Sequence, residues 1–453
     1  MSLRPITIDE RFRQGRRAQD SVCPAPRNRR DPSRAARLLL TLGVLSGSAC
    51  YDRVLVPGEE TDGRLTVTND EQALDARVTY TDENVDIESG TQPSLVGAAN
   101  APPARAPSSI TLTLISEVEP PMVAGSRVQA TSVWATRDDR TMVSYGMVGS
   151  ATLGALDHFK QLTRKVPKLH SSVSFSDSDV ISVMTDGTVA YAAAATSDIA
   201  QPAPAVLERI ELEGEHFDLG SSQRLPLASF VATSVTSTGS VIYATSGNAG
   251  AVFAFDAGDL SLLGQYDLDD ARWVAWDEDN DRIVVLQGTP GRLAVFQEGA
   301  FPGGSMNLLN TFAFPGADVS GSKSAMEIAG GKAFVAAGPE GVQVVCLDDG
   351  QIVGSVPRPD PASVGLDPSV VVTNAVTVQD DLMFISNGEA GVYAAAGAAS
   401  FESPSCAAQQ IDVLGRLRFD DLESVNHVAY RGEYLFVAAG LGGLKIVLVE
   451  LGG

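Results

Sequence analysis

The chain has 453 residues, 44% of them hydrophobic, and a formal net charge of −23, so it can form two or three domains or one large repeat architecture with a full core. The charge is uneven, because residues 1–49 hold ten arginines against four acids, a net +6, which leaves −29 for residues 50–453. Such an acidic body repels nucleic acid and anionic membrane surfaces, so neither is expected as a partner.

The N-terminal residues have the parts of an export signal. A basic segment, RNRRDPSRAAR, precedes the apolar run LLLTLGVLSGSA (Leu38–Ala49), and Cys50 follows directly. Twelve apolar residues are too few to span a bilayer. The arrangement resembles a bacterial lipoprotein signal, in which the cysteine after a small residue is lipidated; a plain secretory signal is the alternative. We therefore expect residues 1–49 to be a signal segment, Cys50 to be the lipidation site, and the mature protein to lie at the bacterial cell envelope, anchored to the outer membrane on its periplasmic or surface face.

Cysteine usage is compatible with export. Of the four cysteines, Cys23 lies in the removable segment and Cys50 is the lipidation candidate, which leaves Cys346 and Cys406. Two remaining cysteines in an oxidising compartment can form a disulfide. The alternative is a buried strand thiol at 346 and an unrelated loop thiol at 406, and spacing alone does not decide between them.

Residues 50–107 are predicted to be a tether. Acidic residues are frequent up to Glu88, and the Pro/Ala-rich run GAANAPPARAPSS closes the segment. High charge with little apolar content argues against a packed core, so we expect a flexible chain that holds the following domain away from a membrane. The fragments RLTVT and RVTYT alternate like strands, so a small hairpin is the alternative.

From residue 108 onward the sequence repeats itself. Short alternating apolar runs are separated by Gly, Asp, Asn and Ser, and helical periodicity is nearly absent, which predicts an all-β region. Seven anchor segments start at Met142, Tyr191, Tyr243, Val284, Phe334, Phe384 and Phe436. Their spacings are 49, 52, 41, 50, 50 and 52 residues. Six of them end in a Gly-x-x-Gly pair, and these predicted turn glycines are Gly146, Gly149, Gly247, Gly250, Gly288, Gly291, Gly338, Gly341, Gly388, Gly391, Gly440 and Gly443.

Each unit contains a strand, a polar turn, a second strand that enters the Gly-x-x-Gly turn, a third strand that leaves it and a more variable fourth strand. Four strands in 40–50 residues is the size of one propeller blade. A single blade cannot bury both of its faces, so packing the units around a ring creates the core. Residues 108–453 are therefore predicted to form a seven-bladed β-propeller.

The last unit lacks its fourth strand. The chain ends soon after the third strand of that unit, and ITLTLISEV (Ile110–Val118) precedes the first full unit with an alternating pattern. We predict that this segment supplies the outer strand of the last blade, which closes the ring and removes an open edge.

The repeat resembles that of the LVIVD-repeat family of β-propeller proteins. GLKIVLVEL (Gly443–Leu451) is the best copy, with Leu444, Ile446 and Val447 in register, and GVQVVCLDD is the next. The resemblance implies a propeller fold and an association with bacterial lipoproteins. It implies no particular activity, because the family has no shared enzymatic reaction.

No segment predicts a catalytic, cofactor or metal site. The four histidines have no metal-ligand spacing, and no Gly-x-Ser-x-Gly motif occurs. WDEDNDR places Asp277, Asp279 and Asp281 at alternate positions, which calcium sites also use, but it falls where each unit has its first hairpin turn and is interpreted as a polar turn. The three tryptophans show no periodicity. We expect no cofactor and no metal.

We therefore expect a non-catalytic binding or scaffold module. If the blades are wound as propellers usually are, the Gly-x-x-Gly turns gather on the face that carries binding sites. Their variable pairs, such as Pro339-Glu340 and Glu389-Ala390, would then recognise a protein or glycan partner at the envelope. We expect a monomer that meets the membrane through its lipid anchor alone.

The alternative function is a propeller-type hydrolase or lactonase with its site in the central channel. Such a site needs several polar side chains that converge from different blades. The predicted innermost strands offer few of them: Glu327, Asn374, Asn426 and His427.

Overall fold

The computed structural model describes residues 59–88, 109–136, 140–147, 152–160, 166–316, 323–419 and 424–452. These residues belong to one compact unit, Leu55–Gly453. The predicted signal segment and Cys50 lie outside the described residues. No helix among the described residues is long and apolar enough to cross a membrane.

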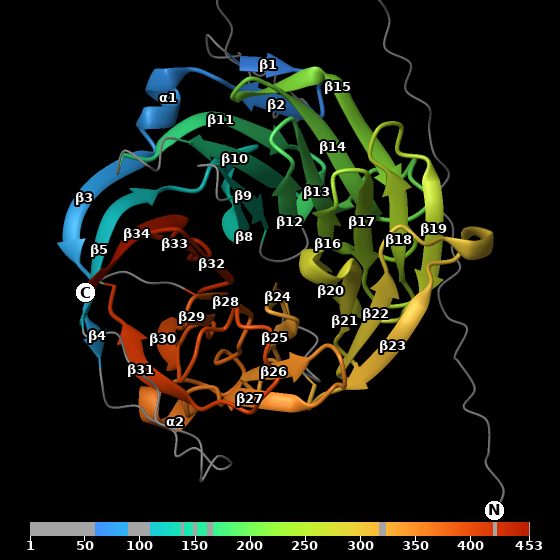
Figure 1. Ribbon diagram of the computed structural model, residues 1–453. Helices are drawn as coiled ribbons and strands as arrows, with labels where there is room; N and C mark the ends of the chain where they lie inside the picture. The colour runs from blue at the N-terminus through green and yellow to red at the C-terminus, as the bar shows by residue number, and fades with distance from the viewer. Residues whose placement is uncertain are drawn as a thin grey trace, which may run out of the picture. The chain divides into compact units, whose positions relative to one another are not determined.

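Seven sheets stand around a central axis, so the predicted seven-bladed β-propeller is confirmed (Figure 1). Blades are numbered here in chain order from residue 129. Blades 2 to 5 each consist of four consecutive antiparallel strands, listed from the axis outward: blade 2, β12 (Ser178–Thr185), β13 (Val189–Thr196), β14 (Ala205–Glu213) and β15 (His216–Pro226); blade 3, β16 (Ala232–Ser237), β17 (Val241–Ser246), β18 (Ala251–Asp256) and β19 (Leu262–Asp267); blade 4, β20 (Ala271–Asp277), β21 (Arg282–Gln287), β22 (Arg292–Gln297) and β23 (Leu308–Ala313); blade 5, β24 (Met326–Ala329), β25 (Lys332–Ala336), β26 (Val342–Cys346) and β27 (Ile352–Val356).

The other three blades also take strands from residues 59–118. In the same order they are: blade 1, β8 (Gln129–Ala135), β9 (Thr141–Gly146), β10 (Gly154–Lys160), β11 (Lys168–Phe175), β2 (Leu65–Thr68) and β1 (Glu59–Thr61); blade 6, β28 (Ala375–Gln379), β29 (Leu382–Ser386), β30 (Val392–Gly397), β31 (Ile411–Leu417) and β4 (Ile87–Glu88); blade 7, β32 (His427–Arg431), β33 (Tyr434–Ala438), β34 (Leu444–Gly452), β5 (Ser109–Val118) and β3 (Val78–Asn84). The remaining short elements are α1 (Glu71–Asp75), β6 (Met122–Val123), β7 (Ser126–Arg127), η2 (Glu278–Asn280), η3 (Pro302–Gly304) and α2 (Pro361–Val364).

The core lies between the blades. The second strand of each repeating unit is buried on both faces and mainly apolar, because each face packs on a neighbouring blade; every residue of β17 and of β25 is buried. Unbroken short apolar runs are typical of strands buried on both sides. Alanine-rich β13 shows the same pattern, with seven of its eight residues buried.

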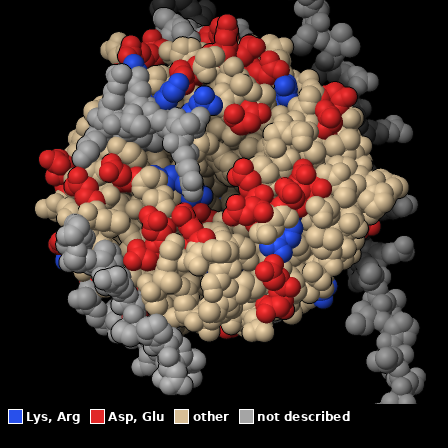
Figure 2. All heavy atoms as spheres, in the orientation of Figure 1, with Lys and Arg blue, Asp and Glu red and all other residues tan. Residues whose placement is uncertain are grey.

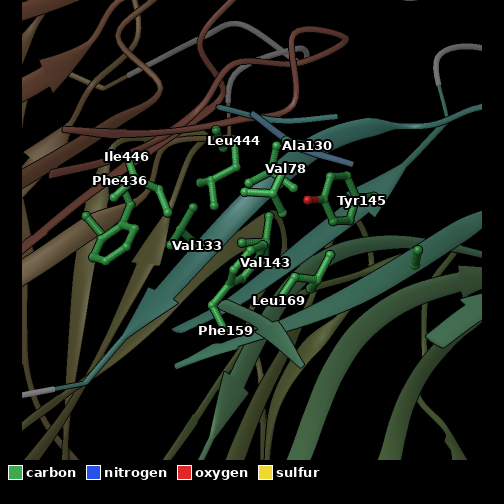
Figure 3. Close-up of a cluster of buried hydrophobic side chains, with 14 of the residues drawn as sticks. Val78, Ala130, Val133, Val143, Tyr145, Phe159, Leu169, Phe436, Leu444 and Ile446 are labelled. Atoms are coloured by element: carbon green, nitrogen blue, oxygen red, sulfur yellow. The ribbon is translucent and has the colours of Figure 1, made fainter. Parts of the chain in front are cut away.

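The predicted ring closure is confirmed. β5 pairs antiparallel with β34, from Val118 opposite Leu444 to Ser109 opposite Gly452. Figure 3 shows the seam beside this pairing, where Phe436, Leu444 and Ile446 of blade 7 lie with side chains of blade 1 in one buried cluster. The backbone also crosses the seam, since Ala130 N donates to Gly440 O at 2.8 Å.

The predicted flexible tether needs correction for residues 59–88, named here the N-terminal arm. The arm forms a hairpin of β1 and β2 on β11, the short helix α1, and single strands that pair with β5 and β31. Leu65, Val67 and Leu74 are buried. Composition was misleading because the apolar residues alternate and share one sheet face while the acids point outward. RLTVT and RVTYT do form strands, but they do not pair with each other: the first lies in β2, which pairs with β1 and β11, and the second in β3, which pairs with β5. Residues 50–58 and 89–107 lie outside the described residues.

Arg77 attaches the arm to two blades. Its guanidinium donates to both carboxylate oxygens of Asp157 in β10, at 3.1 and 2.5 Å, and to the carbonyl of Glu119 just after β5, at 2.9 and 3.0 Å. The side chain of Asp157 is fully buried and that of Arg77 is 17% exposed. One side chain thus joins the arm, the closing strand and blade 1.

Candidate binding site in the central channel

The Gly-x-x-Gly turns join the second strand of a blade to the third. Because the strands are antiparallel, these turns share one face of the ring with the linkers between blades, and the first hairpin turns lie on the opposite face. In blades 5, 6 and 7 both glycines of each pair have left-handed φ, between +55° and +86°. In blade 5 a Cβ on Gly341 would also lie 2.1 Å from Val356 O. Both the conformation and the space there require glycine.

The other pairs have a different geometry. Gly146, Gly247, Gly250, Gly288 and Gly291 do not have positive φ. Most of them are crowded instead; a Cβ on Gly291, for example, would lie 2.3 Å from the Cα of Gly316. Gly149 lies outside the described residues. Small size at the turn is therefore common to the repeat, whereas a pair of left-handed glycines is described in blades 5, 6 and 7; in blade 3 the left-handed residue of the turn is Ala249, with φ of +52°.

The variable turn residues offer a small surface. Glu340 and Glu389 are exposed, whereas Ala390 is buried and Pro339 is half-buried. One described cavity is lined by the first strands of all seven blades. A second includes residues of the blade 3 and blade 4 turns in its lining, among them Asn248, Ala249 and Thr289. The role of the turns in partner recognition stays a prediction.

One cavity of about 530 Å³ is lined by residues from the innermost strands of all seven blades. All three tryptophans of the chain line it: Trp134 of β8 and Trp273 and Trp276 of β20. Each is half-buried, so part of each indole is available to a ligand. The indole N–H groups of Trp134 and Trp276 have no hydrogen-bond partner among the described residues.

This tryptophan cavity opens on the face opposite the Gly-x-x-Gly turns. Exposed residues of three first hairpin turns line its mouth: Asp186, Gly239 and Glu278. Figure 2 shows one face of the ring, on which acidic side chains gather around the central hollow.

The polar side chains that a hydrolase would need are held in contacts between blades. Glu327 of blade 5 pairs with Arg431 of blade 7 at 2.8 Å and accepts from Val378 N of blade 6 at 3.2 Å. Asn426 Nδ2 donates across the seam to Ala130 O at 2.8 Å. Asn374 Nδ2 donates to Val425 O at 3.2 Å. These three groups therefore tie neighbouring blades together.

His427, the fourth such residue, stacks on Trp273 from the other side of the channel, with ring centroids 5.3 Å apart and planes inclined by 23°. Burial lowers the pKa of His427 to about 3, and the nearby charges of Lys323 and Arg431 add to this effect. The imidazole is therefore neutral at physiological pH and acts as a flat packing surface.

A second cavity, of about 880 Å³, lies on the side of the Gly-x-x-Gly turns, and Trp273 lines both cavities. Lys323 crosses the channel above β24, and its Nζ donates to Thr131 O at 2.5 Å and to Ile181 O at 3.1 Å. Burial lowers the pKa of Lys323 to about 7, against the opposing effect of Asp179. The lysine therefore links blade 5 to blades 1 and 2.

Two further sequence predictions concern metal and disulfide chemistry. Asp277 accepts hydrogen bonds from Asn280 Nδ2 and Arg282 Nε within the turn that contains η2, so the polar-turn interpretation is confirmed. Cys346 and Cys406 form a disulfide with an S–S distance of 2.01 Å. Among the described residues, the one group of three possible metal ligands consists of these bonded cysteines and Asp348.

The tryptophan cavity is the feature that sequence reasoning missed. The three tryptophans are not periodic, but all of them lie in innermost strands: Trp134 in β8 and both Trp273 and Trp276 in β20. That position was the available signal, since the first strand of every blade faces the channel.

The fold defines the protein as a seven-bladed β-propeller. No model of a known protein family matches the chain, and no curated protein matches it. Among solved structures, it is similar to a chain in the crystal structure of a mitotic checkpoint complex, with a TM-score of 0.51 and 11% identity over 79% of this chain and 98% of that chain. It is also similar to the computationally designed Ika8 protein, with a TM-score of 0.42 and 10% identity over 73% and 99% of the two chains. At these identities the similarity concerns the fold alone.

Proposed function

We propose that the protein is an exported binding module, tethered to the cell envelope by a lipid on Cys50, that takes a small ligand into its tryptophan cavity. The convergence of all three tryptophans on one cavity carries the proposal. A volume of about 530 Å³ falls in the range of small-molecule sites, which are mainly apolar and aromatic with a few polar groups.

Binding is favoured over the alternative, a propeller-type hydrolase or lactonase, because the polar side chains of the channel are already engaged in contacts between blades. Glu327 is paired with Arg431, and His427 is a neutral ring stacked on Trp273. A general base needs a free acceptor and a pKa near the working pH. Glu327 is held by its ion pair, and His427, although its Nδ1 has no hydrogen-bond partner among the described residues, has a pKa that burial lowers to about 3.

Export is supported by two observations. The Cys346–Cys406 disulfide suits an oxidising compartment. The N-terminal segment resembles a lipoprotein signal, and the repeat resembles that of LVIVD propellers, which are often bacterial lipoproteins. Mass spectrometry of the protein purified from membranes tests the anchor: we expect diacylglycerol on Cys50, and we expect Cys50→Ala to release the protein from the membrane fraction. An unmodified cysteine in membrane-extracted protein would contradict the anchor.

Intrinsic fluorescence tests the binding proposal, because every tryptophan lines the tryptophan cavity; Trp273 also lines the second cavity, so one variant in each cavity separates the two sites. We expect a saturable change in emission with at least one member of a panel of amines, sugars, amino acids and nucleosides. Ala135→Phe, which narrows the tryptophan cavity, should abolish the change. Asn248→Phe, in the second cavity, is the matched control and should leave it intact.

Two results would contradict this proposal. One is unaltered emission with the whole panel. The other is turnover of a lactone or ester substrate that Glu327→Gln abolishes in a folded protein, because that result would assign the channel to the hydrolase alternative.

A further inference from the structure

The charges around the tryptophan cavity restrict the chemistry of its ligand. Four charged residues line it: Asp186, Glu278, Glu327 and Arg431. The last two form an ion pair at 2.8 Å and neutralise each other. Two carboxylates remain, both exposed at the mouth, and no ion pair joins either of them to another described residue.

We infer that the ligand is a small organic cation, such as an alkylated ammonium group, which the tryptophans contact and the carboxylates at the mouth attract. This inference rests on the proposed function, because it names the ligand class of the same cavity. Indole is the best aromatic partner for a cation, and the attraction grows when the cation loses water. The cavity offers indole groups as partners for the cation and an apolar lining that removes its water, and the carboxylates at its mouth attract positive charge.

Other ligand classes fit less well. An anion would meet the unpaired carboxylates at the entrance. A metal ion needs several ligands at close range, and no described residue of this cavity belongs to a group of three such ligands. A neutral sugar would use the indoles but would gain nothing from the charge.

The two carboxylates are not equivalent. Asp186 accepts from Thr188 N and Val189 N within its own turn, at 2.8 and 2.9 Å. Arg140 packs against the adjacent Gly187, where a Cβ would lie 1.5 Å from its Nη1. With Thr188 Oγ1 also donating at 2.8 Å, Asp186 Oδ1 accepts three hydrogen bonds within its own turn, so Glu278 is the main attracting group. The net charge of −29 on residues 50–453 adds a long-range attraction for cations.

The test compares choline with its uncharged analogue 3,3-dimethylbutan-1-ol. Each compound is titrated into the full-length protein at low ionic strength, and tryptophan fluorescence is measured. The two probes share a shape, so their difference measures the contribution of charge. We expect saturable binding of choline and at least about tenfold weaker binding of the alcohol. Glu278→Gln should weaken choline binding about fivefold and leave the alcohol unchanged. Glu340→Gln, an equal charge change at an exposed turn on the opposite face, should have little effect.

Equal affinity for the two probes would overturn the inference, and so would equal effects of Glu278→Gln and Glu340→Gln. In both cases the cavity would still bind a ligand, so the proposed function would stand. If neither probe binds while a sugar or a nucleoside alters the emission, the inference fails and the proposed function again stands. If no compound of any class alters the emission, both fail.

Discussion

Blades 5 and 7 carry almost the same repeat but are assembled from different parts of the chain. Blade 5 is continuous, from β24 to β27. Blade 7 takes three strands from the end of the chain and two, β3 and β5, from near its beginning. The local geometry is nevertheless the same: Val342 pairs with Val356 in blade 5, and Leu444 pairs with Val118 in blade 7. The shape of a blade is therefore a property of the repeat, whereas its connection to the ring is not.

The difference lies in the cost of bringing the outer strand into place. In blade 5 a short turn joins the third and fourth strands, whereas in blade 7 the paired residues are more than 300 positions apart. Loop-closure entropy makes the second pairing less favourable by roughly 3 to 4 kcal/mol. The N-terminal arm offsets this cost, because β3 covers the outer edge of β5 and Arg77 holds the segment after it.

The largest effect is expected from removing the closing strand. A chain that begins at residue 119 lacks β5, exposes the edge of β34 and opens the buried cluster of Figure 3. We expect it to aggregate or to lose cooperative unfolding. A chain that begins at residue 89 keeps β5 and loses the arm, so it should fold with a clearly lower melting temperature than a chain that begins at residue 59. Thermal unfolding by circular dichroism measures all three. Equal melting temperatures for the chains that begin at 59 and 119 would show that β5 does not stabilise the ring.

A smaller effect is expected from breaking the attachment of the arm. Arg77→Ala leaves the carboxylate of Asp157 buried without its partner, and removing one member of a buried ion pair costs about 3 kcal/mol. Arg418→Ala is the control. Arg418 also holds the arm, through an ion pair with Glu88 at 3.4 Å, but the Arg418 side chain is 66% exposed and that of Glu88 is 50% exposed. That exposed pair should contribute less than about 0.5 kcal/mol. Urea unfolding gives both values, and similar losses for the two variants would mean that burial does not distinguish the pairs.

Sequence reasoning reached the blades and the closing strand for a physical reason. The anchors Phe334 and Phe436 mark strands buried on both faces, and such strands need unbroken apolar runs that are easily recognised. Ile110–Val118 was recognisable because the last unit lacks its fourth strand, so another segment of the chain must pair with its third strand. The first prediction used a pattern that recurs in every unit, and the second used the strand that the last unit lacks.

The arm and the cavity followed no repeat and were therefore missed. Leu65 and Val67 alternate over too few residues to outweigh the acids around them. The tryptophan cavity is formed by the ring as a whole, because Trp134 and Trp273 belong to blades 1 and 4 and line one cavity only when seven blades surround one axis. The spacing of residues along the chain does not show which of them line the same cavity at the axis.

The smallest effect is expected at the turn glycines, where the two blades are most nearly matched. A Cβ on Gly341 would lie 2.1 Å from Val356 O, and a Cβ on Gly443 would lie 2.0 Å from Val118 O; both glycines have left-handed φ. Each substitution to alanine should cost about 2 kcal/mol, because the outer strand must move. Gly432→Ala is the control, since Gly432 has φ of +61° but open space around its Cα, and it should cost about 1 kcal/mol.

The two variants should differ in which segment is released. In Gly341→Ala the displaced strand β27 stays attached through its short turn, whereas in Gly443→Ala the displaced strand β5 has no neighbour in sequence within its own blade. Limited proteolysis should therefore cut near residues 109–118 in Gly443→Ala and leave β27 intact in Gly341→Ala. Equal resistance of the two variants at matched stability would mean that the arm and the buried seam hold β5 as firmly as a covalent turn holds β27.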